Sequence, residues 1–107
     1  MDHRELAAEL FLSDCNCAQA VLEAFGDVTG LEKSFAAKLA SSFGGGMGRM
    51  REVCGAVSGM LMVAGLLYGY DDPGENDVNK KAHYRLVQNL AGQFREKIGS
   101  IICREIL

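Results

Sequence analysis

Apolar residues recur at steps of three and four positions along most of the chain, which is the spacing of one face of an α-helix. Four stretches follow this pattern and are each predicted to form a helix: residues 6–11, 18–25, 31–43 and 83–98. Glycine-rich positions interrupt the pattern and predict the helix ends, at Gly26, Gly30, residues 44–46, residues 69–74 and Gly99. No stretch of comparable length alternates with a period of two, so the sequence predicts no strand.

A further helix is predicted over residues 53–70, which are 18 residues without a charge. Four of them are glycines, and on a helix these glycines fall within an arc of about 120°. Such a bare face lets a second helix approach closely, while the glycines, Tyr68 and Tyr70 dilute the apolar character that a membrane span needs. We therefore predict a buried central helix surrounded by the others, and no transmembrane segment.

The predicted fold class is all-α: a single-domain helical bundle over residues 1–107, with five helices, a short C-terminal helix and a central apolar, glycine-rich helix. A chain of 107 residues suits one hydrophobic core. The composition, with 49% hydrophobic residues and 1 proline, excludes a disordered or collagen-like chain.

The charges of the chain limit the classes of partner that we expect. The formal net charge is −3, divided into −3 over residues 1–52, −3 over residues 53–75 and +3 over residues 76–107. Without an overall basic field, nucleic acid is not an expected partner. The first five residues are mostly charged and lead into no long apolar run, so we expect no signal peptide and a cytoplasmic protein.

Four cysteines carry the clearest chemical signal: Cys15, Cys17, Cys54 and Cys103. At this density, in a chain without an export signal, cysteines are more often metal ligands or redox groups than structural bridges. No Cys-x-x-Cys pair is present, so zinc-finger and thioredoxin-like sites lack their usual spacing. The alternative is that the four thiols are inert core residues, since a buried cysteine behaves as a small hydrophobe.

Three of these cysteines are predicted to lie at helix N-termini. Each follows a cap-forming residue or the glycine triplet: Ser13 or Asp14 before Cys17, Ser100 before Cys103 in the third position, and residues 44–46 before Cys54. Unpaired N–H groups and the positive end of the helix dipole favour an anion, so each thiol should ionise more easily and serve as a nucleophile or metal ligand. Three arginines close in sequence would add positive charge: Arg49, Arg51 and Arg104.

Other candidate groups are less specific. If both were helical, Cys15 would lie about 200° around the helix from Cys17, so we expect it to point elsewhere. Residues 44–48 lack the Lys-Ser/Thr of a phosphate-binding loop and follow a predicted helix instead of a strand. We expect His83 to be an ordinary helix residue with satisfied hydrogen bonds, and residues 71–75 to form a solvated acidic turn.

The sequence blocks around the cysteines resemble one known family. These blocks are CGAVSG at residues 54–59, FGGGMG at 43–48, NCAQAV at 16–21 and CRE at 103–105. They are similar to the redox-active protein family named for its C_GCAxxG_C_C cysteine pattern, and the resemblance covers nearly the whole chain. It matches Cys17, Cys54 and Cys103 to the family's cysteines and implies a redox role. A related domain in split-Soret cytochrome c implies an iron–sulfur cluster.

The resemblance leaves the fourth cluster ligand open. Longer members of the family continue past the region of Cys103 into a segment with another cysteine, whereas this sequence ends at Leu107. The fourth position could be filled by Cys15, if the second helix begins only at Asn16, by His83, by solvent or by a partner chain. No Cys-x-x-Cys-His is present, so no haem attachment is expected.

We therefore predict a redox-active protein that binds an iron–sulfur cluster or a metal through Cys17, Cys54 and Cys103 and takes part in electron transfer. One alternative is a thiol–disulfide redox protein or sensor without metal. Another is a helical interaction module with inert cysteines. The bare face of the central helix and the shortage of ligands predict a homodimer with an unidentified redox partner.

Overall fold

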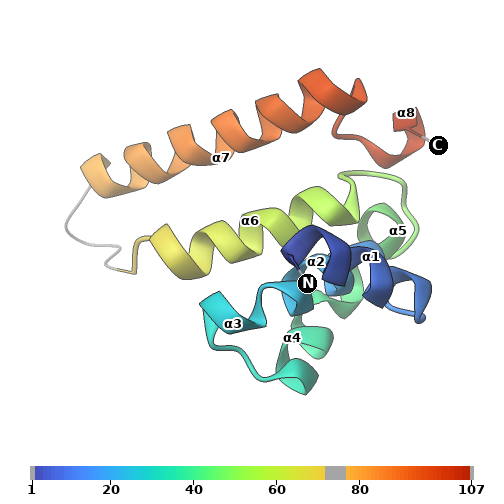
Figure 1. Ribbon diagram of the computed structural model, residues 1–107. Coiled ribbons are helices and arrows are strands. Elements are labelled where there is room, and N and C mark those ends of the chain that lie inside the picture. Colours follow the sequence, from blue (N-terminus) through green and yellow to red (C-terminus); the bar gives the residue numbers. More distant parts are fainter. Residues whose placement is uncertain (1, 72–76, 107) are drawn as a thin grey trace.

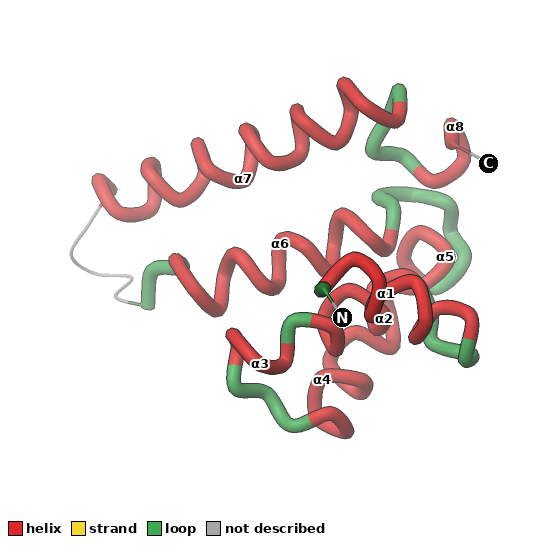
Figure 2. The backbone as a smooth tube through the Cα atoms, in the orientation of Figure 1, coloured by secondary structure: helices red, strands yellow, loops and turns green. Residues whose placement is uncertain are grey.

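The computed structural model describes residues 2–71 and 77–106, and over these residues the fold is all-α, as predicted (Figure 1, Figure 2). In chain order the elements are α1 (His3–Leu12), α2 (Cys17–Ala24), α3 (Gly26–Thr29), α4 (Lys33–Ala40), the 3-10 turn η1 (Ser41–Phe43), α5 (Gly44–Met47), α6 (Gly55–Tyr68), α7 (Asp77–Ile98) and α8 (Cys103–Ile106). This part of the chain contains no strand, and a single antiparallel bridge joins Val53 to Ile102.

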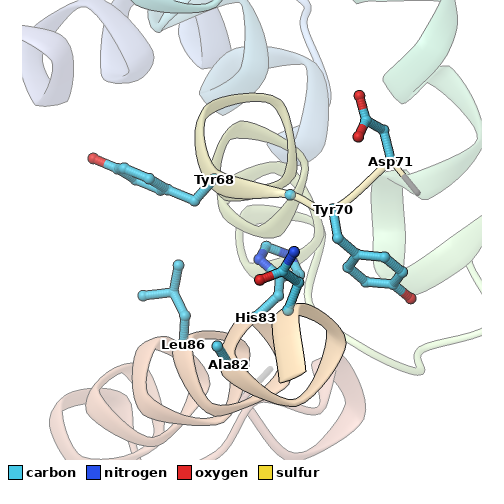
Figure 3. Close-up of a pocket in the computed structure, with 8 residues that line it drawn as sticks. Tyr68, Tyr70, Asp71, Ala82, His83 and Leu86 are labelled. Carbon is cyan, nitrogen blue, oxygen red and sulfur yellow. The ribbon is translucent and has the colours of Figure 1, made fainter. Parts of the chain in front are cut away.

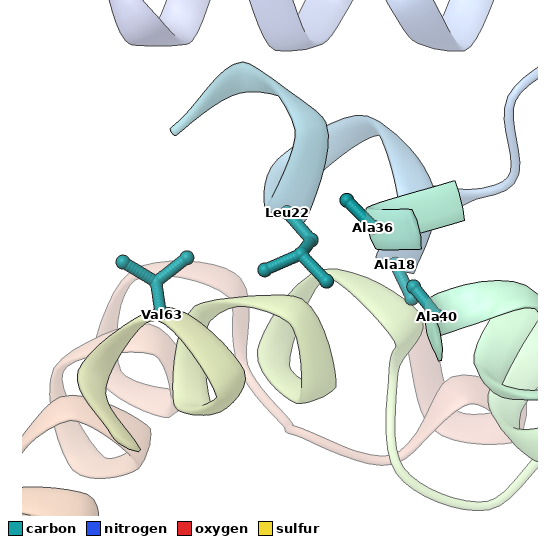
Figure 4. Close-up of a cluster of buried hydrophobic side chains, with 5 residues drawn as sticks. All are labelled: Ala18, Leu22, Ala36, Ala40 and Val63. Carbon is teal, nitrogen blue, oxygen red and sulfur yellow. The ribbon is translucent and has the colours of Figure 1, made fainter. Parts of the chain in front are cut away.

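The core forms where α2 packs against both α4 and α6 (Figure 4). Its buried side chains are small or of medium size: Ala18 and Leu22 from α2, Ala36 and Ala40 from α4, and Val63 from α6. Partly buried Phe25 and Phe43 pack against this cluster. The alanines let the three helices come close, because no long side chain separates their backbones.

The amino-terminal half of α6 is buried, as predicted for the central helix. A Cβ atom on Gly59 would lie 2.9 Å from the carbonyl oxygen of Ala18 and from Val21 Cβ. One on Gly55 would lie 3.1 Å from the amide nitrogen of Ala18. Both distances are shorter than ordinary van der Waals contact, so these two glycines allow the close approach of α2.

The last turn of α6, from Gly65 to Tyr68, is not surrounded by other helices, contrary to the prediction. Gly65 has no neighbouring atom within 4 Å of the place where a Cβ would stand. Leu66, Leu67 and Tyr68 are 47%, 42% and 69% exposed. The reason is length: α2 has 8 residues and α6 has 14, so α2 covers little more than half of α6 at 1.5 Å per residue.

The long helix predicted around residues 83–98 is α7, which runs alongside α6 (Figure 1). Its apolar stripe is only half-buried, and includes Leu86, Leu90 and Phe94. α7 ends at Ile98, where Gly99 follows with a φ of +103°, a conformation that glycine adopts readily at helix ends. Among residues 2–71 and 77–106, neither α6 nor any other helix is long and apolar enough to cross a membrane.

Local hydrogen bonds explain why α2 begins later than predicted. Its cap is Asn16, not Ser13 or Asp14: Gln19 N donates to Asn16 Oδ1 (2.8 Å), and Asn16 N donates to Gln19 Oε1 (3.0 Å). Ser13 instead ends α1, and its hydroxyl donates to the carbonyl oxygen of Glu9 (2.9 Å). Cys15 therefore lies before α2 and not within it.

Two further boundaries differ from the prediction. Residues 31–43 form α4 followed by η1 and not one continuous helix. Residues 26–29, between two predicted stops, form the additional short helix α3, which ends where Gly30 adopts a φ of +75°. The predicted helix end at residues 69–74 is confirmed where it begins, because α6 ends at Tyr68 and Gly69 is its cap. The acidic turn predicted at residues 71–75 lies, apart from Asp71, outside the described residues.

Candidate functional site

Three of the four cysteines line one open cavity of about 700 Å³. Cys17 is the first residue of α2, Cys54 immediately precedes α6, and Cys103 is the first residue of α8. The start of α6 lies at the same end of the molecule as α5 and α8 (Figure 1). The fold thus brings together thiols from three helix starts that are far apart in the sequence.

The start of α2 positions Cys17. The Asn16 cap that begins this helix also donates from Nδ2 to the carbonyl oxygen of Ser41 (3.2 Å), which ties the helix start to η1. A Cβ on Gly55 would lie only 3.0 Å from Cys17 Cβ, and one on Gly44 only 2.5 Å from Asn16 Cβ. These two glycines therefore let the starts of α2, α5 and α6 meet beside the Cys17 thiol.

Cys54 and Cys103 are held by a short antiparallel pairing around the Val53–Ile102 bridge. The N–H of Cys54 donates to the carbonyl oxygen of Ile101 (2.8 Å), and the N–H of Cys103 donates to that of Glu52 (2.6 Å). These two bonds join the chain before α6 to the chain before α8. They set the backbone positions of both cysteines at one side of the cavity.

The prediction that Ser100 caps the last helix and places Cys103 in its third position is wrong. α8 begins at Cys103 itself. The Ser100 hydroxyl accepts a hydrogen bond from Ile102 N (3.0 Å) and donates to Glu105 Oε1 (2.5 Å). Ser100 therefore orders the turn that leads into α8 without capping it.

The glycine-rich segment forms a left-handed turn against the cavity. Five consecutive residues, from Gly45 to Arg49, have φ between +61° and +71°, and Arg51 follows at +61°. This conformation costs a residue with a side chain about 1–2 kcal/mol, and Met47, Arg49 and Arg51 all adopt it. The turn brings Arg49 and Arg51 into the cavity lining.

The three arginines near the cysteines differ in their contacts. Arg51 lines the cavity and donates from Nη1 to Cys103 Sγ at 3.8 Å. Arg104 is not in the lining; it forms an ion pair with Glu52 (3.1 Å) and donates to the carbonyl oxygen of Arg51 (3.2 Å). The expected positive charge at the cysteines therefore comes from Arg49 and Arg51.

Cys17 is harder to ionise than the helix-start argument predicted. Burial raises the pKa of the Cys17 thiol above its usual value, and the nearby Cys54 and Cys103 raise it further. A hydrogen bond from the backbone opposes this shift but is a smaller effect than burial. The direction of this shift is opposite to the easier ionisation that was predicted for Cys17, and burial is its largest cause.

Cys15 lies apart from the other three cysteines. It lines a separate surface hollow together with Gln19, Glu23 and Lys33. Its Sγ donates to Glu23 Oε2 at 3.5 Å, and burial followed by the charge of Glu23 raises the pKa of this thiol. Cys15 lies before the cap residue Asn16, whose backbone is extended (φ −75°, ψ 171°), whereas Cys17 is the first residue of α2, so the two cysteines enter different environments.

A third hollow, of about 370 Å³, lies between the carboxyl end of α6 and the start of α7 (Figure 3). Tyr68, Tyr70 and His83 line it, and the Tyr70 ring stands edge-on to His83 at 6.1 Å between centroids. Among the described residues, His83 Nδ1 is buried and has no hydrogen-bond partner, contrary to the expectation of a satisfied histidine. Because this hollow lies at the carboxyl end of α6, His83 is at the opposite end of that helix from the cysteine cavity.

The side chains in the lining of the cysteine cavity that could act as metal ligands are the three thiols and the polar groups of Asn16 and Ser41. Within residues 2–71 and 77–106, no three His, Cys, Asp or Glu side chains are placed to hold one metal ion together. Sequence reasoning missed two features of this site. The Asn16–Gln19 pair has the spacing of a capping box and could have been found, whereas the Val53–Ile102 bridge carries no local signal.

The comparisons with known proteins agree with the motif blocks. A family model described as "Putative redox-active protein (C_GCAxxG_C_C)" matches residues 15–107. The chain belongs to this family. The match includes all four cysteines and confirms the resemblance found in the sequence. Neither the curated proteins nor the solved structures gave a significant match to the chain.

Proposed function

We propose that this member of the redox-active family carries an iron–sulfur cluster held by Cys17, Cys54 and Cys103 and acts in electron transfer. The observation that carries the proposal is the convergence of three thiols from three helix starts on one cavity. Thiolate sulfur is the usual protein ligand of iron–sulfur clusters, and such a cluster supplies a one-electron redox step.

The spread of the thiols suits a cluster better than a single metal ion. In a [4Fe–4S] cluster each cysteine bonds a different iron, so the ligand sulfurs stand farther apart than around one ion, where each metal–sulfur bond is about 2.3 Å long. The three thiols of this chain are distributed around a cavity of about 700 Å³. Two of their Cβ atoms pack against Gly46 and Gly55, where any side chain would intrude on the cysteine.

Groups of the chain itself offset the negative charge that three thiolates would bring. Arg51 donates to Cys103 Sγ, and Arg49 lines the same cavity. Cys17 and Cys54 stand at the amino ends of α2 and α6, where the helix dipole is positive. Burial, followed by the nearby Cys54 and Cys103, raises the pKa of Cys17, and a bound metal centre would favour the thiolate against these effects.

A second copy of the chain would complete the ligand set. Cys15 and His83 lie in separate hollows, so the described lining of the cavity offers no fourth cysteine or histidine. Phe11 and Ile106 line the cavity and are 53% and 37% exposed, which suits a surface that a partner covers. We therefore propose a homodimer, in which the second copy covers this surface and supplies the missing ligand. A reducing compartment such as the cytoplasm would keep the thiols free to bind the cluster.

Anaerobic purification of the protein after growth with iron tests the cluster. We expect broad visible absorption that bleaches on reduction with dithionite, with iron and acid-labile sulfide in equal amounts. A colourless protein that stays free of iron after reconstitution with iron and sulfide would contradict the cluster. If that protein contained a reducible cysteine pair, a thiol–disulfide role would replace the proposed role of the cluster.

Sedimentation equilibrium of the same sample tests the homodimer. The chain has a mass of 11.5 kDa, so the dimer predicts twice this value at tens of micromolar protein. A single species at the mass of one chain would exclude a ligand from a second copy.

A further inference from the structure

The cysteine cavity contains positive charge that no acidic side chain in its lining neutralises. Its volume of about 700 Å³ lies within the range of small-molecule pockets, about 300–1,000 Å³. Arg49 and Arg51 line it, and among the described residues of the lining there is no aspartate, glutamate or histidine. A site with two guanidinium groups and no carboxylate favours an anionic ligand.

The side chains of Arg49 and Arg51 converge beside Gly45. A Cβ on Gly45 would lie 2.9 Å from Arg49 Cγ and 3.5 Å from Arg51 Nη1, so both side chains pass over the bare backbone of Gly45. Gly45 has a φ of +64°, which glycine adopts without strain. The glycine therefore leaves room for the arginine side chains to converge.

The backbone holds these arginines at an energetic cost. Arg49 and Arg51 have φ of +68° and +61°, conformations that cost residues with side chains about 1–2 kcal/mol each. Strain of this kind concentrates at ligand-binding positions. The guanidinium of Arg49 forms no ion pair or hydrogen bond with any residue that the structure describes. Arg104, by contrast, is paired with Glu52.

We propose that Arg49 and Arg51 bind the oxyanion or carboxylate group of a small anionic substrate beside the three cysteines. The planar guanidinium group matches such anions through paired N–H donors. Gly55 at the amino end of α6 also lines the cavity, and the helix dipole there adds to the attraction. This inference goes beyond the proposed function: the anion site uses the two arginines while the three cysteines are protonated thiols, and it does not require a cluster.

Isothermal titration calorimetry of the reduced, metal-free protein tests the anion site. The probes are sodium phosphate, sodium thiosulfate and sodium succinate, each at constant ionic strength set with potassium chloride. We expect at least one probe to bind at one site per chain, and the preferred probe distinguishes an inorganic oxyanion from a carboxylate. No saturable binding of any probe would overturn the proposal.

Three arginine variants show whether the bound anion occupies this cavity. Arg49→Gln and Arg51→Gln should each weaken binding about tenfold, which corresponds to about 1.4 kcal/mol. Arg95→Gln on α7 is the control, because it removes a positive charge from outside the lining, and it should bind as the unaltered protein does. Equal weakening in all three variants would indicate attraction by general surface charge and would contradict the site.

Arg49→Gly separates ligand binding from a structural role. This variant removes the guanidinium and relieves the left-handed backbone, so the melting temperature should rise while anion binding falls. A lower melting temperature would assign Arg49 to the folded structure and overturn its role in binding. Iron and sulfide content is measured separately, so a failed cluster with intact anion binding contradicts only the proposed function, and the reverse result contradicts only this inference.

Discussion

The two ends of α6 are both uncharged, apolar and contain glycine, but they have different surroundings. At the amino end, Gly55 and Gly59 lie against α2 at distances that leave no space for a side chain. At the carboxyl end, Gly65 faces open space, and Leu66 and Tyr68 are exposed. Both ends are apolar and glycine-rich in the sequence, so this pattern does not show where packing is tight. The tight end is the one that adjoins the three cysteines.

The largest effect is expected at Gly46, which packs against Cys103 in the lining of the cysteine cavity. An alanine Cβ would lie 2.6 Å from Cys103 Cβ and 2.8 Å from Glu52 N, at a φ of +71°. Strain of about 1–2 kcal/mol and overpacking of about 1–3 kcal/mol together predict that Gly46→Ala lowers the free energy of unfolding by about 3 kcal/mol. Urea denaturation measures this change.

Gly48→Ala is the matched control for that experiment. Gly48 has a similar φ of +61°, but its nearest neighbour would be 3.8 Å from the added Cβ. Only the backbone strain remains, so we expect a loss of about 1 kcal/mol. Equal losses in the two variants would show that crowding at Cys103 contributes nothing.

The next effect compares glycines within α6 itself. Gly59→Ala would place a Cβ 2.9 Å from Ala18 O, and the two helices would have to separate. Overpacking exceeds the gain of about 1 kcal/mol in helix propensity, so we expect a net loss of about 1–2 kcal/mol. An unchanged urea midpoint would mean that α2 and α6 are less closely packed than the structure indicates.

The same substitution at the open end should have the opposite sign. Gly65→Ala adds a methyl group where no atom lies within 4 Å, on a helix that favours alanine. We expect the free energy of unfolding to rise by about 0.5–1 kcal/mol. Thermal and urea unfolding measure this change. A destabilised Gly65→Ala would contradict the prediction and would indicate that this face of α6 is covered in solution.

The smallest effect concerns pH. The pKa of Cys17 is raised in the folded protein, chiefly by burial, so folding favours the neutral thiol. This contribution is complete below the pKa of an unfolded cysteine, about 8.5, and is lost as the pH rises through the higher folded value. The metal-free protein should therefore lose more stability between pH 8 and pH 10 than Cys17→Ala does; parallel pH profiles would contradict the shift.

Apolar stripes of helical period predicted α1, α2, α4 and α7, and the uncharged run of residues 53–70 predicted α6. The short helices α3 and α5 were not predicted, because their glycines indicated helix ends. The grouping of Cys17, Cys54 and Cys103 was predicted from their positions near helix starts. The left-handed turn from Gly45 to Arg49 was not predicted, since only three of its five residues are glycines and Met47 and Arg49 disfavour that conformation. The exposure of Leu66 was missed because the pattern of one helix does not give the length of its neighbour.

The central claim is that the cysteines at the tight end of α6 form one redox centre, and that Cys15 takes no part. Iron content after anaerobic purification tests this most directly in two single variants, Cys54→Ser and Cys15→Ser, with circular dichroism as the check on folding. We predict that Cys54→Ser loses most of its iron and visible absorption while Cys15→Ser retains both. Iron retained by a folded Cys54→Ser, or lost from a folded Cys15→Ser, would contradict the claim.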